Sequence, residues 1–142
     1  MHDDAAMADV GGTTIRPWEG RDRERVQALL KVLSQSAVVR NEDAPTYVAE
    51  RDGRIVGMVT LCILRTLTGP KAYLDHLVVA SDWRRRGIGR ALMEHAIEQA
   101  RVSGASRIDL TANTEKQAGR ALYRSLGFQK RDTASFRLNL SD

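Results

Sequence analysis

The sequence predicts one α/β domain with a mixed β-sheet, and three observations support this. Short β-type runs alternate with helical patterns in the order β-α-β-β-β-α-β-α-β. Asp52-Gly53 joins two of the β-type runs, which is a strong hairpin signal. The 142 residues contain no internal repeat and no linker, and this length suits a single domain. We therefore expect a flexible N-terminal tail over residues 1–12 and one domain over residues 13–142.

The first half of the chain is expected to contain a strand, a helix and a hairpin. Thr13–Pro17 is a short β-type run, and Arg21–Ser34 has its apolar residues at helical spacing. The hairpin strands are Thr46–Glu50 and Ile55–Leu64. The second of them is apolar almost throughout, which is typical of a strand buried on both faces.

The second half alternates strands with helices. Lys71–Ala80 and Arg107–Thr111 are predicted strands. Helices are predicted over Gly87–Ser103, which ends at a glycine stop, and over Lys116–Leu126. Phe128–Leu140 is expected to supply the last β material of the sheet.

Composition and charge narrow the function classes. The chain has 22 Lys and Arg against 18 Asp and Glu, a net charge of +4, which favours a polyanionic ligand. No apolar run approaches the roughly 20 residues of a membrane-spanning helix. The single cysteine, Cys62, allows no intrachain disulfide and suits a reducing compartment. We therefore expect a cytoplasmic protein without a membrane partner.

The tightest basic cluster lies between a predicted strand and a predicted helix, in the segment Arg84-Arg85-Arg86-Gly87-Ile88-Gly89-Arg90. Glycines let a backbone approach a phosphate closely, and the first N–H groups of a helix attract anions. The segment lacks the Lys-Ser/Thr ending of a nucleoside-triphosphate loop and the first glycine of the dinucleotide fingerprint. It therefore predicts an anion site that is neither an ATP nor an NAD loop.

Three segments in sequence order resemble the GCN5-related N-acetyltransferase (GNAT) superfamily. Arg84–Gly89 matches its Arg/Gln-x-x-Gly-x-Gly/Ala signature, Leu74–Val79 resembles the preceding strand, and Ala121–Phe128 resembles the closing helix-to-strand signature. The resemblance implies a GNAT fold, with a central, mixed, mostly antiparallel sheet of six to seven strands and helices on both faces. It also implies a splayed strand pair, after Val79 and at Ile108–Leu110, that holds acetyl-CoA.

The resemblance implies a set of donor-binding residues and no metal. The pyrophosphate would lie on the backbone N–H groups of Arg85–Gly89, and the pantetheine arm along Leu77–Val79. An asparagine that many relatives use for the donor is replaced here by Lys116, and Asn113 could substitute for it. The expected donor-binding residues are Leu77, Val78, Val79, Arg84, Arg85, Arg86, Gly87, Ile88, Gly89, Arg90 and Asn113.

Three residues are candidates for proton transfer. Tyr123 lies one position off the apolar stripe of its helix, and the resemblance implies that it protonates the departing thiolate; packing of its ring against the sheet is the alternative. Asp75 and His76 are candidate bases in the middle of a strand, where alternation places them on opposite faces. Asp75 occupies the position of a glutamate base in several relatives, whereas an imidazole titrates nearer neutral pH. Water could replace either one.

The expected function is an N-acetyltransferase that moves an acetyl group from acetyl-CoA to a primary amine of a small molecule or peptide, by direct attack in a ternary complex. A non-catalytic acyl-CoA-binding sensor is the alternative. Nucleic acid is not expected as a partner, because the chain has no basic tail and no interleaved exposed aromatics. A homodimer is left open, as is the identity of the acceptor.

Overall fold

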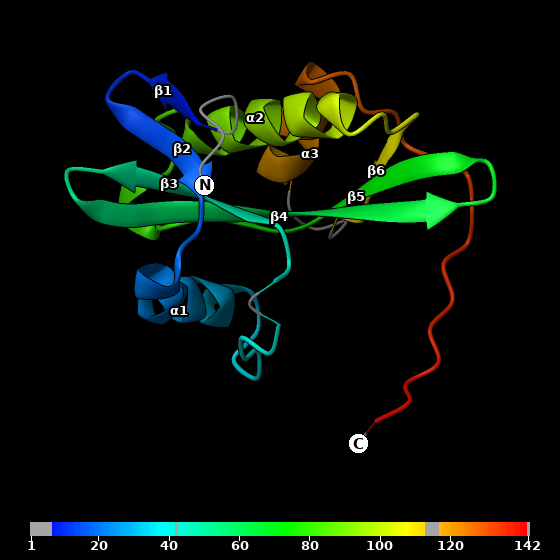
Figure 1. Cartoon of the computed structure of the whole chain (residues 1–142), viewed down its shortest axis with the longest axis horizontal. Coiled ribbons are helices and arrows are strands. Elements are labelled where there is room, and N and C mark those ends of the chain that lie inside the picture. Colours follow the sequence, from blue (N-terminus) through cyan, green and yellow to red (C-terminus); the bar gives the residue numbers. More distant parts are fainter. Residues whose placement is uncertain (1–6, 42, 113–116, 142) are drawn as a thin grey trace. The chain divides into compact units, whose positions relative to one another are not determined.

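The computed structural model describes residues 7–41, 43–112 and 117–141. The chain divides into a larger compact unit, Met1–Thr111, and a smaller one, Ala112–Asp142. Within the described residues the larger unit contains a six-stranded sheet, whose strands are arranged in the order in which they follow along the chain (Figure 1).

The elements of the larger unit are β1 (Ala8–Val10), β2 (Thr13–Pro17), the 3₁₀ turn Gly20–Asp22, α1 (Arg23–Leu33), β3 (Thr46–Arg51), β4 (Arg54–Thr66), β5 (Gly69–Val79), the 3₁₀ turn Ser81–Trp83, α2 (Ile88–Val102) and β6 (Ile108–Leu110). The smaller unit contains α3 (Gln117–Ser125). None of the helices in the described part of the chain combines the length and apolar composition needed to cross a bilayer.

The sheet is mixed and mostly antiparallel, as expected. Strands β1 to β5 pair antiparallel with their neighbours, and β6 pairs parallel with β5. The hairpin between β3 and β4 turns at Asp52 and Gly53, which have φ of 51° and 75°. Two consecutive positive φ angles fit a type I′ turn, so the Asp-Gly signal is confirmed.

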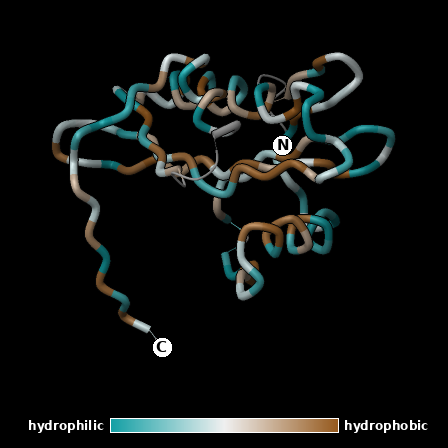
Figure 2. The backbone as a smooth tube through the Cα atoms, turned by 180° about the vertical axis from the view of Figure 1, so that it is seen from behind, coloured by the Kyte–Doolittle hydropathy of each residue, from teal (hydrophilic) through white to brown (hydrophobic). Residues whose placement is uncertain are grey.

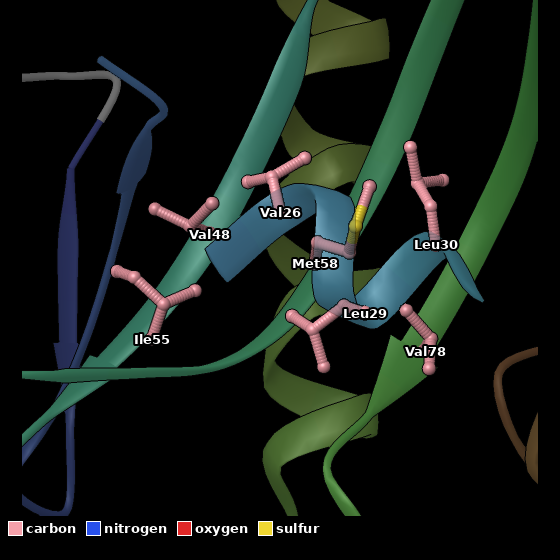
Figure 3. Close-up of a cluster of buried hydrophobic side chains, with 7 residues drawn as sticks. All are labelled: Val26, Leu29, Leu30, Val48, Ile55, Met58 and Val78. Atoms are coloured by element: carbon pink, nitrogen blue, oxygen red, sulfur yellow. The ribbon is translucent and has the colours of Figure 1, made fainter. Parts of the chain in front are cut away.

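Helices cover both faces of the sheet, α1 on one face and α2 on the other (Figure 1). Helix α2 packs closely on β4, because Gly57 carries no side chain: a Cβ there would lie 3.0 Å from Leu92 Cδ1 and 3.2 Å from the Val78 carbonyl oxygen. On the other face, α1 packs on a cluster of buried apolar side chains (Figure 3). Its members are Val26, Leu29, Leu30, Val48, Ile55, Met58 and Val78. Burial of both faces therefore accounts for the continuous apolar run of β4, which lies in the brown tract along the sheet in Figure 2.

A buried ion network joins β2, β3 and the first 3₁₀ turn. The Arg16 guanidinium donates to both carboxylate oxygens of Asp22, at 2.8 and 3.0 Å, and to Glu50 Oε2 at 2.7 Å. Burial acts to raise the pKa of Asp22, but the hydrogen bonds from Arg16 and from the Glu19 N–H bring it below its ordinary value. The Asp22 carboxylate is therefore stabilised in its charged form inside the fold.

Two features differ from the sequence prediction. Ala8–Val10, within the expected tail, forms strand β1, because the Gly11-Gly12 turn lets it fold back on β2. Phe128–Leu140 forms no strand, which corrects the expectation of a seventh strand in the described chain. Figure 2 shows its alternation of polar and apolar residues, and Phe136, Leu138 and Leu140 are exposed. Alternation predicts which residues share a face, but it does not supply a partner strand.

Candidate functional site

The candidate site is centred on β5, whose pairing changes at Leu74. Parallel pairing with β6 covers Ala72, Tyr73 and Leu74 only, whereas antiparallel pairing with β4 continues to Val79. The segment Asp75–Val79 therefore has a strand partner on one side only within the described chain. We call its unpaired side the open edge of β5.

Backbone donors line this open edge. The Ala80 N–H donates to the Val56 carbonyl of β4 at 2.8 Å. Because successive N–H groups of a strand point to opposite sides, those of Val79 and Leu77 point to the open edge. Pairing between β5 and β6 ends at Leu74 and Leu110, which fits the separation of these strands that the resemblance implies.

A β-bulge interrupts β5 at His76. The register with β4 shifts between Met58 and Thr60, and His76 has a φ of 52°, in the left-handed region. The His76 N–H donates to Asp75 Oδ1 at 2.8 Å, in place of a ladder bond. A side chain that must adopt positive φ in mid-strand is strained, and such strain concentrates at functional sites.

The bulge also brings the two candidate bases together. His76 Nε2 lies 3.5 Å from Asp75 Oδ2, and both side chains are about half exposed, at 46% and 52%. The expectation that they lie on opposite faces is therefore wrong, because the bulge breaks the alternation of the strand. Two polar residues in the middle of a strand were the only sequence signal of this irregularity.

The loop after β5 leads directly into the N-terminus of α2. Arg85 and Gly87 have φ of 62° and 80°, and α2 begins at Ile88 without a side-chain cap. An uncapped first turn leaves backbone N–H groups available, and the positive end of the helix dipole faces the same way. The predicted anion site thus lies at a helix N-terminus without a side-chain cap, and phosphate binding there stays a prediction.

Three of the basic side chains around this loop have partners nearby in the chain. Arg84 Nε donates to the Val79 carbonyl at 3.1 Å, and Arg90 Nε donates to Glu94 Oε1 at 2.9 Å. The Arg86 guanidinium lies 4.7 Å from the centre of the Trp83 ring. These contacts favour a backbone role for the segment in phosphate binding.

Trp83 is a residue that sequence reasoning missed. The Arg51 guanidinium, at the end of β3, lies 5.5 Å from the centre of the same ring, and it also donates to Thr13 Oγ1 at 3.3 Å. Trp83 therefore connects the β3–β4 hairpin to the loop before α2 through two cation–π contacts. A tryptophan directly before the arginines was visible in the sequence, but its partner on β3 was not.

The predicted donor-binding side chains differ in accessibility. Val78 and Ile88 are only 5% and 3% exposed, and they pack in the core on opposite faces of the sheet. Only their backbones are available to a ligand. Leu77 and Val79 are half-buried, whereas Gly87 and Arg85 are exposed. Asn113 lies outside the described residues.

Tyr123 lies on α3 in the smaller unit. The helix is followed by Gly127, with a φ of 97°, and the Phe128 N–H donates to the Tyr123 carbonyl at 3.0 Å. The rings of Tyr123 and Phe128 meet edge to face, with centroids 6.2 Å apart. Burial raises the pKa of Tyr123, so the phenol keeps its proton at neutral pH.

The mixed sheet and the loop before α2 have the arrangement expected of an acetyltransferase. Comparison with known proteins identifies the family. A model of the Acetyltransferase (GNAT) family matches residues 12–128. The chain belongs to this family, as its three motif segments indicated.

Two similar proteins are named as N-acetyltransferases. N-acetyltransferase family 8 member 3 of Rattus norvegicus is 37% identical over 86 residues, which are 59% of this chain and 38% of that protein. The match thus spans about two fifths of the relative's length. The solved structure of ribosomal-protein-alanine N-acetyltransferase from Brucella melitensis biovar Abortus 2308 has a TM-score of 0.74 and 27% identity, covering 91% of this chain and 99% of that one.

A third comparison concerns the fold alone. An aminoglycoside N-acetyltransferase solved in complex with CoA has a TM-score of 0.78 at 16% identity, covering 91% of this chain and 95% of that one. The mixed open sheet flanked by helices is therefore the GNAT fold.

Proposed function

We propose that this chain is an acetyl-CoA-dependent N-acetyltransferase that acetylates a primary amine. The observation that carries the proposal is the continuity of two backbone features: the open edge of β5 runs directly into the uncapped N-terminus of α2. A ligand with an amide-containing arm and a pyrophosphate would find strand-type donors for the arm and helix-type donors for the phosphates. Acetyl-CoA has both parts.

In this proposal the amine nitrogen attacks the thioester carbonyl, the C–N bond forms and the C–S bond breaks. The products are an N-acetylated amine and CoA with a free thiol. An alkyl ammonium ion has a pKa of about 10, so a proton must leave the nitrogen for attack to occur. The reaction therefore needs a base for this proton and an acid for the thiolate.

The Asp75–His76 pair is our candidate for the base. It lies at the bulge where the open edge begins, and its side chains are accessible, with 3.5 Å between His76 Nε2 and Asp75 Oδ2. Either group could accept the proton directly or through one water. Tyr123 is our candidate acid, because its phenol carries a proton at neutral pH that the departing thiolate could accept.

The acceptor class is suggested by the relatives and is broader than a single compound. The Brucella structure is named for a ribosomal-protein alanine, which is a peptide α-amine, whereas the aminoglycoside enzyme acts on a small molecule. We propose the cytoplasm as the compartment, since Cys62 is a free thiol.

The direct test measures thiol release from acetyl-CoA with a panel of peptides, amino acids, polyamines and aminoglycosides, and confirms the product by its mass. We expect a 42 Da increase in one class of amine. If acetyl-CoA binds by calorimetry but no amine is acetylated, the chain is an acyl-CoA sensor and not an enzyme.

The base assignment is tested with two near-isosteric variants, Asp75→Asn and His76→Gln. If Asp75 accepts the proton, Asp75→Asn lowers kcat by about 10²-fold and removes the acidic limb of the pH–rate profile, whereas His76→Gln changes little. The reverse pattern would make His76 the base and Asp75 its positioning partner. If both variants keep the parent profile, the base assignment is wrong.

A further inference from the structure

The face of β4 and β5 on which α1 packs extends past α1, next to the candidate bases. Met58 belongs to the apolar cluster under α1 (Figure 3), and Thr60 and Cys62 follow it on the same face of β4. Their cross-strand partners on β5 are Asp75 and Tyr73. The side chain of Tyr73 is therefore on the same face of the sheet as the carboxylate of Asp75.

A hydrogen bond fixes Tyr73 at the point where β5 and β6 separate. Its Oη lies 3.0 Å from Thr111 Oγ1, and Thr111 directly follows the last paired residue of β6, Leu110. The phenol thus bridges the two strands just before the open edge begins. Neither the anion site nor the proposed proton transfer accounts for this contact.

Alternation along β5 extends this surface to Lys71. Lys71, Tyr73 and Asp75 share a face, and we call them the acceptor stripe. At about 3.3 Å per residue, Lys71 and Asp75 are roughly 13 Å apart along the strand. A negative group, a half-buried aromatic ring and a positive group thus follow one another on one surface.

The charges around the stripe are otherwise compensated or absent. On this face, between Thr60 and Asp75 of the β4–β5 hairpin, Asp75 is the only acid and Lys71 the only lysine or arginine, and His76 Nε2 lies 3.5 Å from Asp75 Oδ2 just beyond this range. Asp109 of β6 shares the face through its pairing with Tyr73, but its Oδ2 lies 3.4 Å from Arg107 Nε. A polyamine bound with one ammonium at Asp75 would therefore place a second ammonium near Lys71. The two like charges would repel each other, which disfavours a polyamine as the acceptor.

We propose that the acceptor stripe recognises the acetyl acceptor, and that this acceptor is a peptide N-terminus with acidic residues near its start. The α-amine lies at Asp75, the first residues pack on the Tyr73 ring, and an acidic side chain three or four residues along the peptide meets Lys71. Tyr73 and Lys71 are thus specificity-determining residues. The inference rests on the proposed N-acetyltransferase function and narrows its substrate class.

The test compares two peptides that begin with alanine and carry either glutamates or lysines at positions 3 and 4, together with spermidine. We expect the wild type to prefer the glutamate peptide by about fivefold or more in kcat/KM, and Lys71→Glu to reverse this preference. Tyr73→Ala raises the KM for the preferred peptide by about tenfold, while the dissociation constant for acetyl-CoA is unchanged. Thr111→Val, which frees the phenol, gives a smaller increase in KM.

Lys31→Glu, on the exposed side of α1, and Tyr47→Phe, on the α2 face, serve as matched controls that keep the parent KM. Preference for spermidine, or an unchanged preference in Lys71→Glu, overturns the stripe assignment but leaves the acetyltransferase function standing. Absence of turnover with every amine overturns both. An unchanged acceptor KM in Tyr73→Ala removes Tyr73 from the acceptor site.

Discussion

The two halves of β5 differ in what their backbones contact. Ala72, Tyr73 and Leu74 are paired with β4 on one side and with β6 on the other, whereas among the described residues Asp75–Val79 is paired with β4 alone. The first half has a complete set of ladder partners and contributes to stability. The second half keeps its outward N–H groups available, and it is the half that continues into the loop before α2. The first segment thus contributes to the sheet, and the second is the one we propose for ligand binding.

The sharpest way to test this contrast is to remove one N–H group from each half. The Ala72 N–H donates to the Arg107 carbonyl at 3.0 Å, so Ala72→Pro removes a ladder bond in a buried strand. We expect a loss of about 3 kcal/mol or more in the free energy of unfolding, measured by urea denaturation. Val79→Pro removes a donor from the open edge and should cost less than about 1 kcal/mol.

The two proline variants should also differ in their affinity for acetyl-CoA. Val79→Pro weakens acetyl-CoA binding by about tenfold, because it removes one hydrogen bond and places a ring on the open edge. Suppose that both prolines destabilise the fold equally and that Val79→Pro binds acetyl-CoA as the wild type does. The contrast between a paired segment and a ligand-binding segment of β5 would then be wrong.

A second variant tests the loop into which the open edge continues. Gly89→Asp places a carboxylate in the first turn of α2, where the pyrophosphate is expected. Repulsion between like charges should weaken acetyl-CoA binding by about 10²-fold or more in calorimetry, with an unchanged circular dichroism spectrum. Gly89→Ala is the matched control, because it adds a Cβ without charge. It should lose much less affinity for acetyl-CoA. Parent affinity in folded Gly89→Asp would contradict the phosphate assignment.

A third variant separates chemistry from donor binding. Tyr123→Phe removes the proposed acid and keeps the ring, so kcat should fall by about 10²-fold while the donor dissociation constant stays the same. Because the pKa of Tyr123 is raised, turnover by the wild type should persist to about pH 10 before any alkaline limb that reports this group. Tyr47→Phe controls for loss of a partly buried phenol. Undiminished kcat in Tyr123→Phe would reduce Tyr123 to a packing role.

The last prediction concerns the pH dependence of stability at the buried Arg16–Asp22 ion pair. The folded-state pKa of Asp22 is lowered, so its stabilising contribution is present above about pH 4 and is lost as the pH falls through the folded value. Asp22 can change the free energy of unfolding by at most about 1.4 kcal/mol per pH unit. In Asp22→Asn, the free energy of unfolding from urea denaturation should depend less on pH between pH 2 and about 5. The affinity for acetyl-CoA at pH 7 should be unchanged. An identical pH dependence in wild type and variant would contradict the assignment.

Local patterns predicted most elements of the fold. Apolar spacing located α1 and α2 to within a few residues, and Asp52-Gly53 located the β3–β4 hairpin, because these signals depend on residues close in sequence. Strand β1 was missed because a three-residue strand has too few positions to show a period. Phe128–Leu140 has the period of a strand but no partner in the described chain.

The candidate site was predicted less completely. The loop before α2 was found because glycines and arginines are visible as a motif. The bulge at His76, the Trp83 contacts and the hydrogen bond between Tyr73 and Thr111 depend on register and on pairs distant in sequence. One sequence carries no direct signal for such pairs, and residue types alone placed Asp75 and His76 on opposite faces.

The most direct test of the account is residue-resolved amide hydrogen exchange along β5, measured by NMR with and without saturating acetyl-CoA. The outward N–H groups of Leu77 and Val79 should exchange at least about tenfold more slowly when the donor is bound. The Ala72 N–H, already bonded to the Arg107 carbonyl, should not change. Bound donor with unchanged exchange at Leu77 and Val79 would contradict the claim that the open edge of β5 holds acetyl-CoA.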